Sequence, residues 1–186
     1  MADYLQLPGE LVAPLDDGAA DHLTGMMLPG VVLPASDGGK VDLAALSGRI
    51  VLYLYPATGK PGVALPEGWD ALPGARGCTP QSCSFRDHFA ELRALGVSHV
   101  YGISAQPAVE QAEAAERLHL PFALLCDEAG ALRSALGLPS FELGGTLYLK
   151  RMALIVEDGR IAKVFYPVFP PDRNAGEIVA YLSDGR

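Results

Sequence analysis

Two cysteines five residues apart are the residues of this chain best suited to chemistry. Cys78 and Cys83 lie in the segment Gly-Cys-Thr-Pro-Gln-Ser-Cys-Ser-Phe-Arg-Asp, residues 77–87. Pro80 in this segment favours the start of a helix, because its missing N–H would be unpaired in the first turn anyway. A helix N-terminus carries partial positive charge, which favours a thiolate over a thiol. The pair therefore predicts redox chemistry by a nucleophilic cysteine.

The spacing of the pair excludes two common kinds of cysteine site. Thioredoxin-type redox motifs have only two residues between their cysteines, and structural zinc sites need four ligands, usually in grouped cysteines and histidines. One further cysteine, Cys126, is present, and the histidines are scattered along the chain at His22, His88, His99 and His119. We therefore expect no metal site.

Helix geometry sets a condition on any bond between the two cysteines. On an ideal helix, residues five apart have Cα atoms about 8–9 Å apart, whereas a disulfide needs less than about 7 Å. If both cysteines lie in a regular helix, a disulfide between Cys78 and Cys83 requires the first turn to unwind. We expect such a redox-linked change. The alternative, that both are small core residues, is disfavoured by their polar, turn-forming neighbours.

Composition limits the function classes. The 186 residues are 49% hydrophobic and 19% charged, which suffices for one packed domain. A net charge of −8 disfavours nucleic acids and anionic membranes as partners. The chain has no apolar run of about 18 residues, and its first residues lack the features of a signal peptide. We expect a cytoplasmic location, where paired cysteines are more often catalytic than structural.

A buried strand and a helix must position the cysteine pair. Residues 50–55 are unbroken apolar and rich in β-branched and aromatic side chains, which predicts a strand buried on both faces. Residues 56–77 contain five glycines, four prolines and Trp69, which indicates a long loop. A helix is predicted from about residue 80 to 95. Its apolar face is formed by Phe85, Phe89 and Leu92.

The rest of the chain alternates between strands and helices. We expect strands at 97–103, 122–126, 152–156 and 161–168, and helices at 108–118, 129–136 and 174–182. Asp158-Gly159 predicts a hairpin, and Asn174 with Glu177 is typical of a capping box. Residues 1–25 lack a period and are predicted to form an N-terminal arm before one domain at 26–186. The order indicates an α/β, thioredoxin-like fold with a mixed central sheet and helices on both faces.

With these motifs and elements, the chain resembles a known family, the peroxiredoxins, and specifically the bacterioferritin-comigratory-protein or Q-type subfamily. The resemblance covers about residues 25–185, and its most specific part is the segment 77–87, which is similar to that subfamily's active-site helix. Supporting similarities occur at residues 53–56, 95–104, 124–127, 150–155 and 158–159.

The resemblance implies a thiol peroxidase of the atypical two-cysteine type, without metal or organic cofactor. It implies that Cys78 attacks a hydrogen peroxide or organic hydroperoxide oxygen and becomes a sulfenic acid. Cys83 would resolve it as an intramolecular disulfide, which thioredoxin or a similar dithiol would reduce. Arg151 matches the family's active-site arginine, which holds the thiolate and polarises the peroxide. An intramolecular pair needs no second subunit, so we expect a monomer or weak dimer.

The sequence departs from the family in the loop before Cys78. The family motif Pro-x-x-x-Thr/Ser-x-x-Cys would put a hydroxyl residue at position 75, but Ala75 stands there. Thr58 follows the predicted strand, as the family threonine nearly would, and is separated from Cys78 by a link about fifteen residues longer than usual. We interpret residues 57–77 as an insertion that loops out and returns, so that the Thr58 hydroxyl still reaches the peroxide.

Two other functions remain open from the sequence. The cysteine pair would also serve a protein thiol-disulfide oxidoreductase that acts without peroxide. Alternatively, the altered threonine motif marks a non-enzymatic redox sensor or binding module that contacts a partner through the 57–77 insertion. Cys126, at the end of a predicted buried strand, is interpreted as a core residue.

Overall fold

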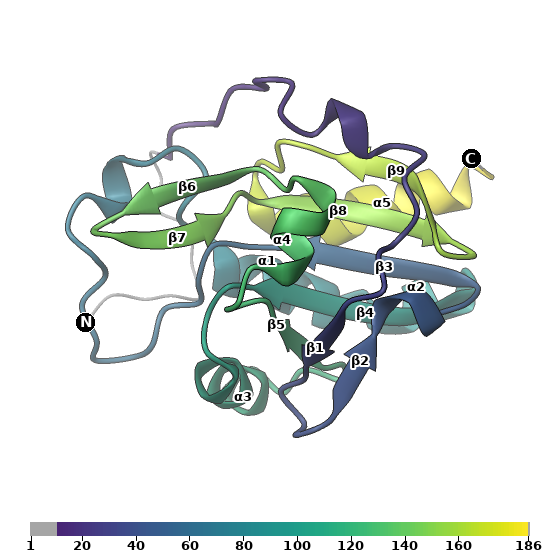
Figure 1. Ribbon diagram of the computed structural model, residues 1–186, viewed down its shortest axis with the longest axis horizontal. Coiled ribbons are helices and arrows are strands. Elements are labelled where there is room, and N and C mark those ends of the chain that lie inside the picture. Colours follow the sequence, from purple (N-terminus) through teal and green to yellow (C-terminus); the bar gives the residue numbers. More distant parts are fainter. Residues whose placement is uncertain (1–10, 186) are drawn as a thin grey trace.

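A five-stranded mixed sheet forms the centre of the computed structural model, which describes residues 11–185 (Figure 1). In the strand order β5-β4-β3-β8-β9, the first three strands are parallel, and β8 runs antiparallel to both β3 and β9. The strands are β3 (Arg49–Leu54), β4 (Val97–Ser104), β5 (Leu124–Cys126), β8 (Met152–Glu157) and β9 (Arg160–Phe165). The mixed sheet agrees with the prediction.

The apolar run of β3 places it at the centre of the sheet. Alternate residues such as Ile50 and Leu52 enter one hydrophobic cluster, whereas Val51 and Tyr53 enter the other. All four side chains are fully buried. Helices and loops therefore cover both faces of this strand, as expected for a strand without alternating polar residues.

The helix that carries the cysteines starts earlier and ends sooner than predicted. It forms α1 (Cys78–Asp87), and a second helix, α2 (Phe89–Ala94), follows after a break at His88. Gly77 precedes α1 with a φ of 99°, a left-handed conformation that glycine adopts without steric cost. The remaining helices are α3 (Ala108–Arg117), α4 (Ala131–Leu136) and α5 (Asn174–Ser183).

The capping box predicted at the start of α5 is wrong. A short 3-10 turn, η4 (Pro171–Arg173), precedes α5, so Asn174 is already helical and Arg173 occupies the capping position without a side-chain cap. The Asn174 side chain instead accepts a hydrogen bond from Gln81 of α1. A tertiary contact has replaced the local one.

Two small hairpins were not predicted, because their strands are too short to show a period. One pairs β1 (Val32–Pro34) with β2 (Lys40–Asp42), and the other pairs β6 (Ser140–Leu143) with β7 (Thr146–Leu149). The loop 57–77 lies against the second hairpin. Its Trp69 is 3% exposed and packs with ring centroids 4.9 Å from Tyr148 and 6.2 Å from Phe141.

Part of the predicted N-terminal arm packs on the rest of the structure, while residues 1–10 lie outside the described residues. Leu23 is fully buried in one of the two hydrophobic clusters. Asp17 accepts hydrogen bonds from Lys150 (2.6 Å) and Tyr166 (2.7 Å). Within residues 11–185, no helix has the length and apolar character needed to cross a membrane.

Candidate active site

Cys78 is the first residue of α1 and lies at the end of the long loop. Because Gly77 turns the backbone into the helix, Cys78 stands at the positive end of α1, where the first-turn N–H groups have no partner within the helix. The Cys78 residue is 3% exposed. Its thiol donates a hydrogen bond to the Ala75 carbonyl oxygen at 3.6 Å.

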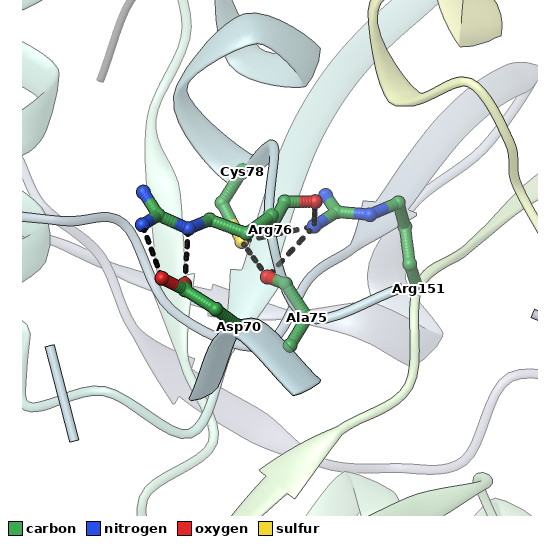
Figure 2. Close-up of polar contacts among 5 residues, drawn as sticks. All are labelled: Asp70, Ala75, Arg76, Cys78 and Arg151. Carbon is green, nitrogen blue, oxygen red and sulfur yellow. Dashed lines mark hydrogen bonds and ion pairs between the residues drawn. The ribbon is translucent and has the colours of Figure 1, made fainter. Parts of the chain in front are cut away.

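Arg151, immediately before β8, brings a permanent positive charge to this thiol (Figure 2). Its Nη2 donates to the Cys78 sulfur at 3.1 Å and to the carbonyl oxygens of residues 74, 75 and 76 at 3.2, 3.3 and 3.0 Å. One NH2 group thus faces four acceptors, so they share its two hydrogens. An acceptor that becomes negatively charged competes best, so this donor is placed to stabilise negative charge that develops on the Cys78 sulfur.

Gln81 and Asn174 also belong to this constellation, although sequence reasoning missed them. Arg151 donates through Nη1 to Gln81 Oε1, and Gln81 donates through Nε2 to Asn174 Oδ1 at 3.0 Å. Both amides are fully buried. The available signal was a polar residue one turn after Cys78, on the side of α1 that faces the core.

A small cavity of about 20 Å³ adjoins Cys78, lined by residues from the loop and the first turn of α1. That volume suits one molecule little larger than water. Four of its lining residues also line a larger groove of about 710 Å³: Ala57, Gly59, Leu65 and Trp69. A small oxidant therefore fits beside the thiol, and the groove next to it leaves room for a bulkier substituent.

Arg76 also lies at this cavity, but its charge is paired. Its guanidinium makes two hydrogen bonds with the carboxylate of Asp70, the second between Nη2 and Oδ2 at 2.9 Å (Figure 2). The contact lowers the pKa of Asp70. Asp70 is largely exposed, so the pair contributes little to stability. Most of the positive potential at Cys78 therefore comes from Arg151.

Within residues 11–185, no hydrogen bond joins either of the other two predicted site residues, Thr58 and Cys83, to Cys78. The Thr58 hydroxyl donates to Gln106 Oε1 at 3.1 Å, and the Thr58 N–H donates to the same oxygen at 2.7 Å. Thr58 lines the larger groove and is not among the lining residues of the small cavity. Cys83, on the next turn of α1, is a half-buried free thiol. Burial raises the pKa of Cys83, which the nearby Arg86 partly opposes.

Cys126 is buried, as predicted. Its thiol donates to the Gln106 carbonyl oxygen at 3.2 Å, and burial raises the pKa of this cysteine. The His88 side chain forms a hydrogen bond within α1 and its C-terminal end, with Nδ1 2.9 Å from the Ser84 carbonyl oxygen.

The chain is similar to a family model and to several named proteins. A family model described as Redoxin matches residues 23–180. The chloroplastic peroxiredoxin Q of rice (Oryza sativa subsp. japonica) is 32% identical over 159 residues, which cover 85% of this chain and 65% of the rice protein. The chain thus spans slightly less than two thirds of that relative. The chloroplastic peroxiredoxin Q of Sedum lineare is 31% identical, with 85% of this chain and 76% of that protein covered.

Solved structures agree. The crystal structure of peroxidoxin BcpB from Mycobacterium tuberculosis matches with a TM-score of 0.70 and 29% identity, covering 88% of this chain and 97% of that chain. The match confirms the predicted thioredoxin-like fold. With the family model spanning most of its length and the Sedum relative above 30% identity, the chain belongs to the Redoxin family and, within it, to the Q-type peroxiredoxins.

Proposed function

We propose that this protein is a thiol peroxidase in which Cys78 reduces hydrogen peroxide or an organic hydroperoxide. The observation that carries the proposal is the 3.1 Å hydrogen bond from Arg151 Nη2 to the sulfur of Cys78, at a helix N-terminus beside a cavity of peroxide size. Relatives of this chain are named peroxiredoxin Q, which supports the same activity.

In the first step the Cys78 thiolate attacks the nearer peroxide oxygen. A sulfur–oxygen bond forms and the oxygen–oxygen bond breaks, so that the sulfur loses two electrons and the peroxide gains them. The departing oxygen takes a proton and leaves as water or an alcohol. Arg151 stabilises the charge that moves from sulfur to oxygen, because its guanidinium is fixed in place before the reaction.

In the second step Cys83 resolves the sulfenic acid. Its sulfur attacks the Cys78 sulfur, a disulfide forms, and the sulfenic oxygen leaves as water. Both cysteines lie within α1, and an ideal helix holds such residues about 8–9 Å apart. The first turn of α1 must therefore unwind. A thioredoxin-like dithiol then supplies two electrons and restores both thiols.

We place the protein in the cytoplasm as a monomer or weak dimer, and we treat residues 57–77 as an insertion into the domain 26–186.

We propose an indirect role for Thr58. With both its hydroxyl and its N–H bound to Gln106, it anchors the start of the loop that carries the lining of the Cys78 cavity.

Rapid-mixing oxidation with mass mapping tests the proposal. One equivalent of peroxide should oxidise Cys78 at least about a hundredfold faster than an unactivated cysteine, the effect of one preorganised donor at a developing charge. It should yield a Cys78–Cys83 disulfide in the native chain and a trapped Cys78 sulfenate in Cys83→Ser. Oxidation at the rate of a free thiol would favour a redox sensor, and reduction of a protein disulfide without peroxide would favour an oxidoreductase. A bridge to Cys126 would contradict the assignment.

A further inference from the structure

A buried chain of hydrogen bonds joins the Cys78 thiol to α5. Arg151 donates to Cys78 through Nη2 and to Gln81 through Nη1, and Gln81 donates to Asn174. The last link connects residues 93 positions apart in the sequence. Gln81 and Asn174 have no exposed surface, so solvent does not compete for these bonds.

The direction of every bond in this chain is dictated by Arg151. A guanidinium carries donors only, so Gln81 must turn its oxygen to Arg151 and its NH2 group to Asn174. Asn174 must then present its own oxygen. Its Nδ2 is left buried without a hydrogen-bond partner among residues 11–185. Asn174 therefore meets Gln81 through its oxygen, at the end of the chain of hydrogen bonds.

Gln81 is the side chain that fixes the orientation of the guanidinium. Arg151 Nε has no hydrogen-bond partner within the described part of the chain, and Nη2 is shared among the sulfur and loop carbonyls. Nη1 donates to Gln81. Without Gln81, hydrogen bonds hold the guanidinium through Nη2 alone, so it is able to pivot about that group and weaken the contact with the sulfur.

We propose, building on the function proposed above, that Gln81 and Asn174 are positioning residues that act on both steps in opposite directions. They hold Arg151 against Cys78, which favours attack on the peroxide. Gln81 also lies between Cys78 and Cys83, in the turn that must unwind before the disulfide forms. Unwinding breaks both Gln81 bonds, so the same chain opposes resolution. Weakening it slows the first step and speeds the second.

The test uses three variants of the full chain and a matched control. Gln81→Leu and Asn174→Leu remove the chain at similar volume. Gln81→Glu retains it, because one carboxylate oxygen accepts from Arg151 and the other accepts from the Asn174 NH2 group once that amide turns over. Ile178→Val, a fully buried residue of α5 outside the chain of bonds, is the control for general loosening of the helix.

Three quantities are measured for each variant: the rate of Cys78 oxidation, the rate of disulfide formation, and the pH profile of Cys78 alkylation by iodoacetamide without peroxide. Gln81→Leu should slow oxidation about tenfold, as expected for loss of a hydrogen bond to a charged group, and Asn174→Leu should slow it less. Both should speed disulfide formation and move alkylation to higher pH. Gln81→Glu should stay within about threefold in oxidation and slow disulfide formation, because it binds Arg151 more strongly.

Two outcomes would overturn the inference. One is an unchanged oxidation rate and alkylation profile in both leucine variants. The other is a match between these variants and Ile178→Val in every measurement, which would make the role structural. If the native chain reacts with peroxide no faster than a free thiol, the proposed function fails. The alkylation profiles, which need no peroxide, still decide whether Gln81 and Asn174 position Arg151.

Discussion

The two cysteines of α1, Cys78 in its first turn and Cys83 in its second, lie in very different surroundings. Cys78 is buried against a guanidinium and a backbone carbonyl, whereas Cys83 is half-buried and burial raises its pKa. Tertiary contacts therefore place a fixed positive charge against Cys78, which its proposed role as the attacking thiol requires. At Cys83, burial outweighs the opposing effect of Arg86 in the folded helix, and we expect this thiol to become more reactive when the turn unwinds.

The contrast teaches that helix position alone does not make a nucleophile. Only Cys78 gains the N-terminal dipole, which weakens after the first turn, but the dipole contributes less than a fixed guanidinium in contact with the sulfur. The contact comes from residue 151, which lies 73 positions along the chain from Cys78. Removing the contact between Arg151 and Cys78 should make the reactivities of Cys78 and Cys83 more alike.

The largest effect is expected from Arg151→Leu. Peroxide oxidation of Cys78 should slow by about 100-fold, because the fixed charge at the reacting sulfur is lost. Arg151→Lys should recover only part of the rate, since an ammonium group cannot reach Gln81, the loop carbonyls and the sulfur together. Rapid-mixing kinetics measures both, with Arg93→Leu, a distant arginine of α2, as the control. Equal rates for Arg151→Leu and the native chain would remove Arg151 from the site.

Loss of the Trp69 side chain should disturb Cys78 without touching Cys83. Trp69 packs on the β6–β7 hairpin and lines the Cys78 cavity, so Trp69→Ala should lower the free energy of unfolding by about 3 kcal/mol. Denaturant titration measures this. Mass-mapped alkylation should also be faster at Cys78 and unchanged at Cys83. Equal acceleration at both cysteines would mean that the whole helix has loosened.

The pH dependence of Cys83 should differ between the folded and unfolded chain. Burial disfavours the charged thiolate and raises the pKa above the ordinary 9.0, so the alkylation midpoint of Cys83 in the folded Cys78→Ser variant should lie above 9.0. In urea the midpoint should fall toward the ordinary value. The Cys83 thiolate, which is the form that reacts with the alkylating reagent, therefore forms at higher pH when the protein is folded. A folded midpoint below the unfolded one would reverse the comparison.

The smallest effect is expected from Thr58→Val. Because the Thr58 hydroxyl is bound to Gln106, its removal should slow Cys78 oxidation by less than about threefold, the range of one weak hydrogen bond. Ser104→Ala, which removes a buried hydroxyl bound to the Pro56 carbonyl at the same end of the sheet, is the matched control. A tenfold decrease confined to Thr58→Val would give Thr58 the direct role on peroxide predicted from the sequence.

The sequence predicted the elements that have strong local signals. The apolar run of β3, the helix that carries both cysteines and the Asp-Gly hairpin of β8 and β9 were all located, because periodicity and turn residues act over a few neighbours. The hairpin β6–β7 was missed, since strands of four residues show too little alternation. The break between α1 and α2 at His88 was also missed, because no glycine or proline lies near it in the sequence.

By itself the sequence determined which cysteines stand at a helix start and how far apart they are, because these properties depend only on spacing and local preference. The tertiary structure alone decided what surrounds each sulfur. It brought Arg151 to Cys78, turned Thr58 to Gln106, and diverted Asn174 from a helix cap to Gln81. The physical reason is that buried polar groups must find partners wherever the fold brings them, and no local pattern records partners that are distant in the chain.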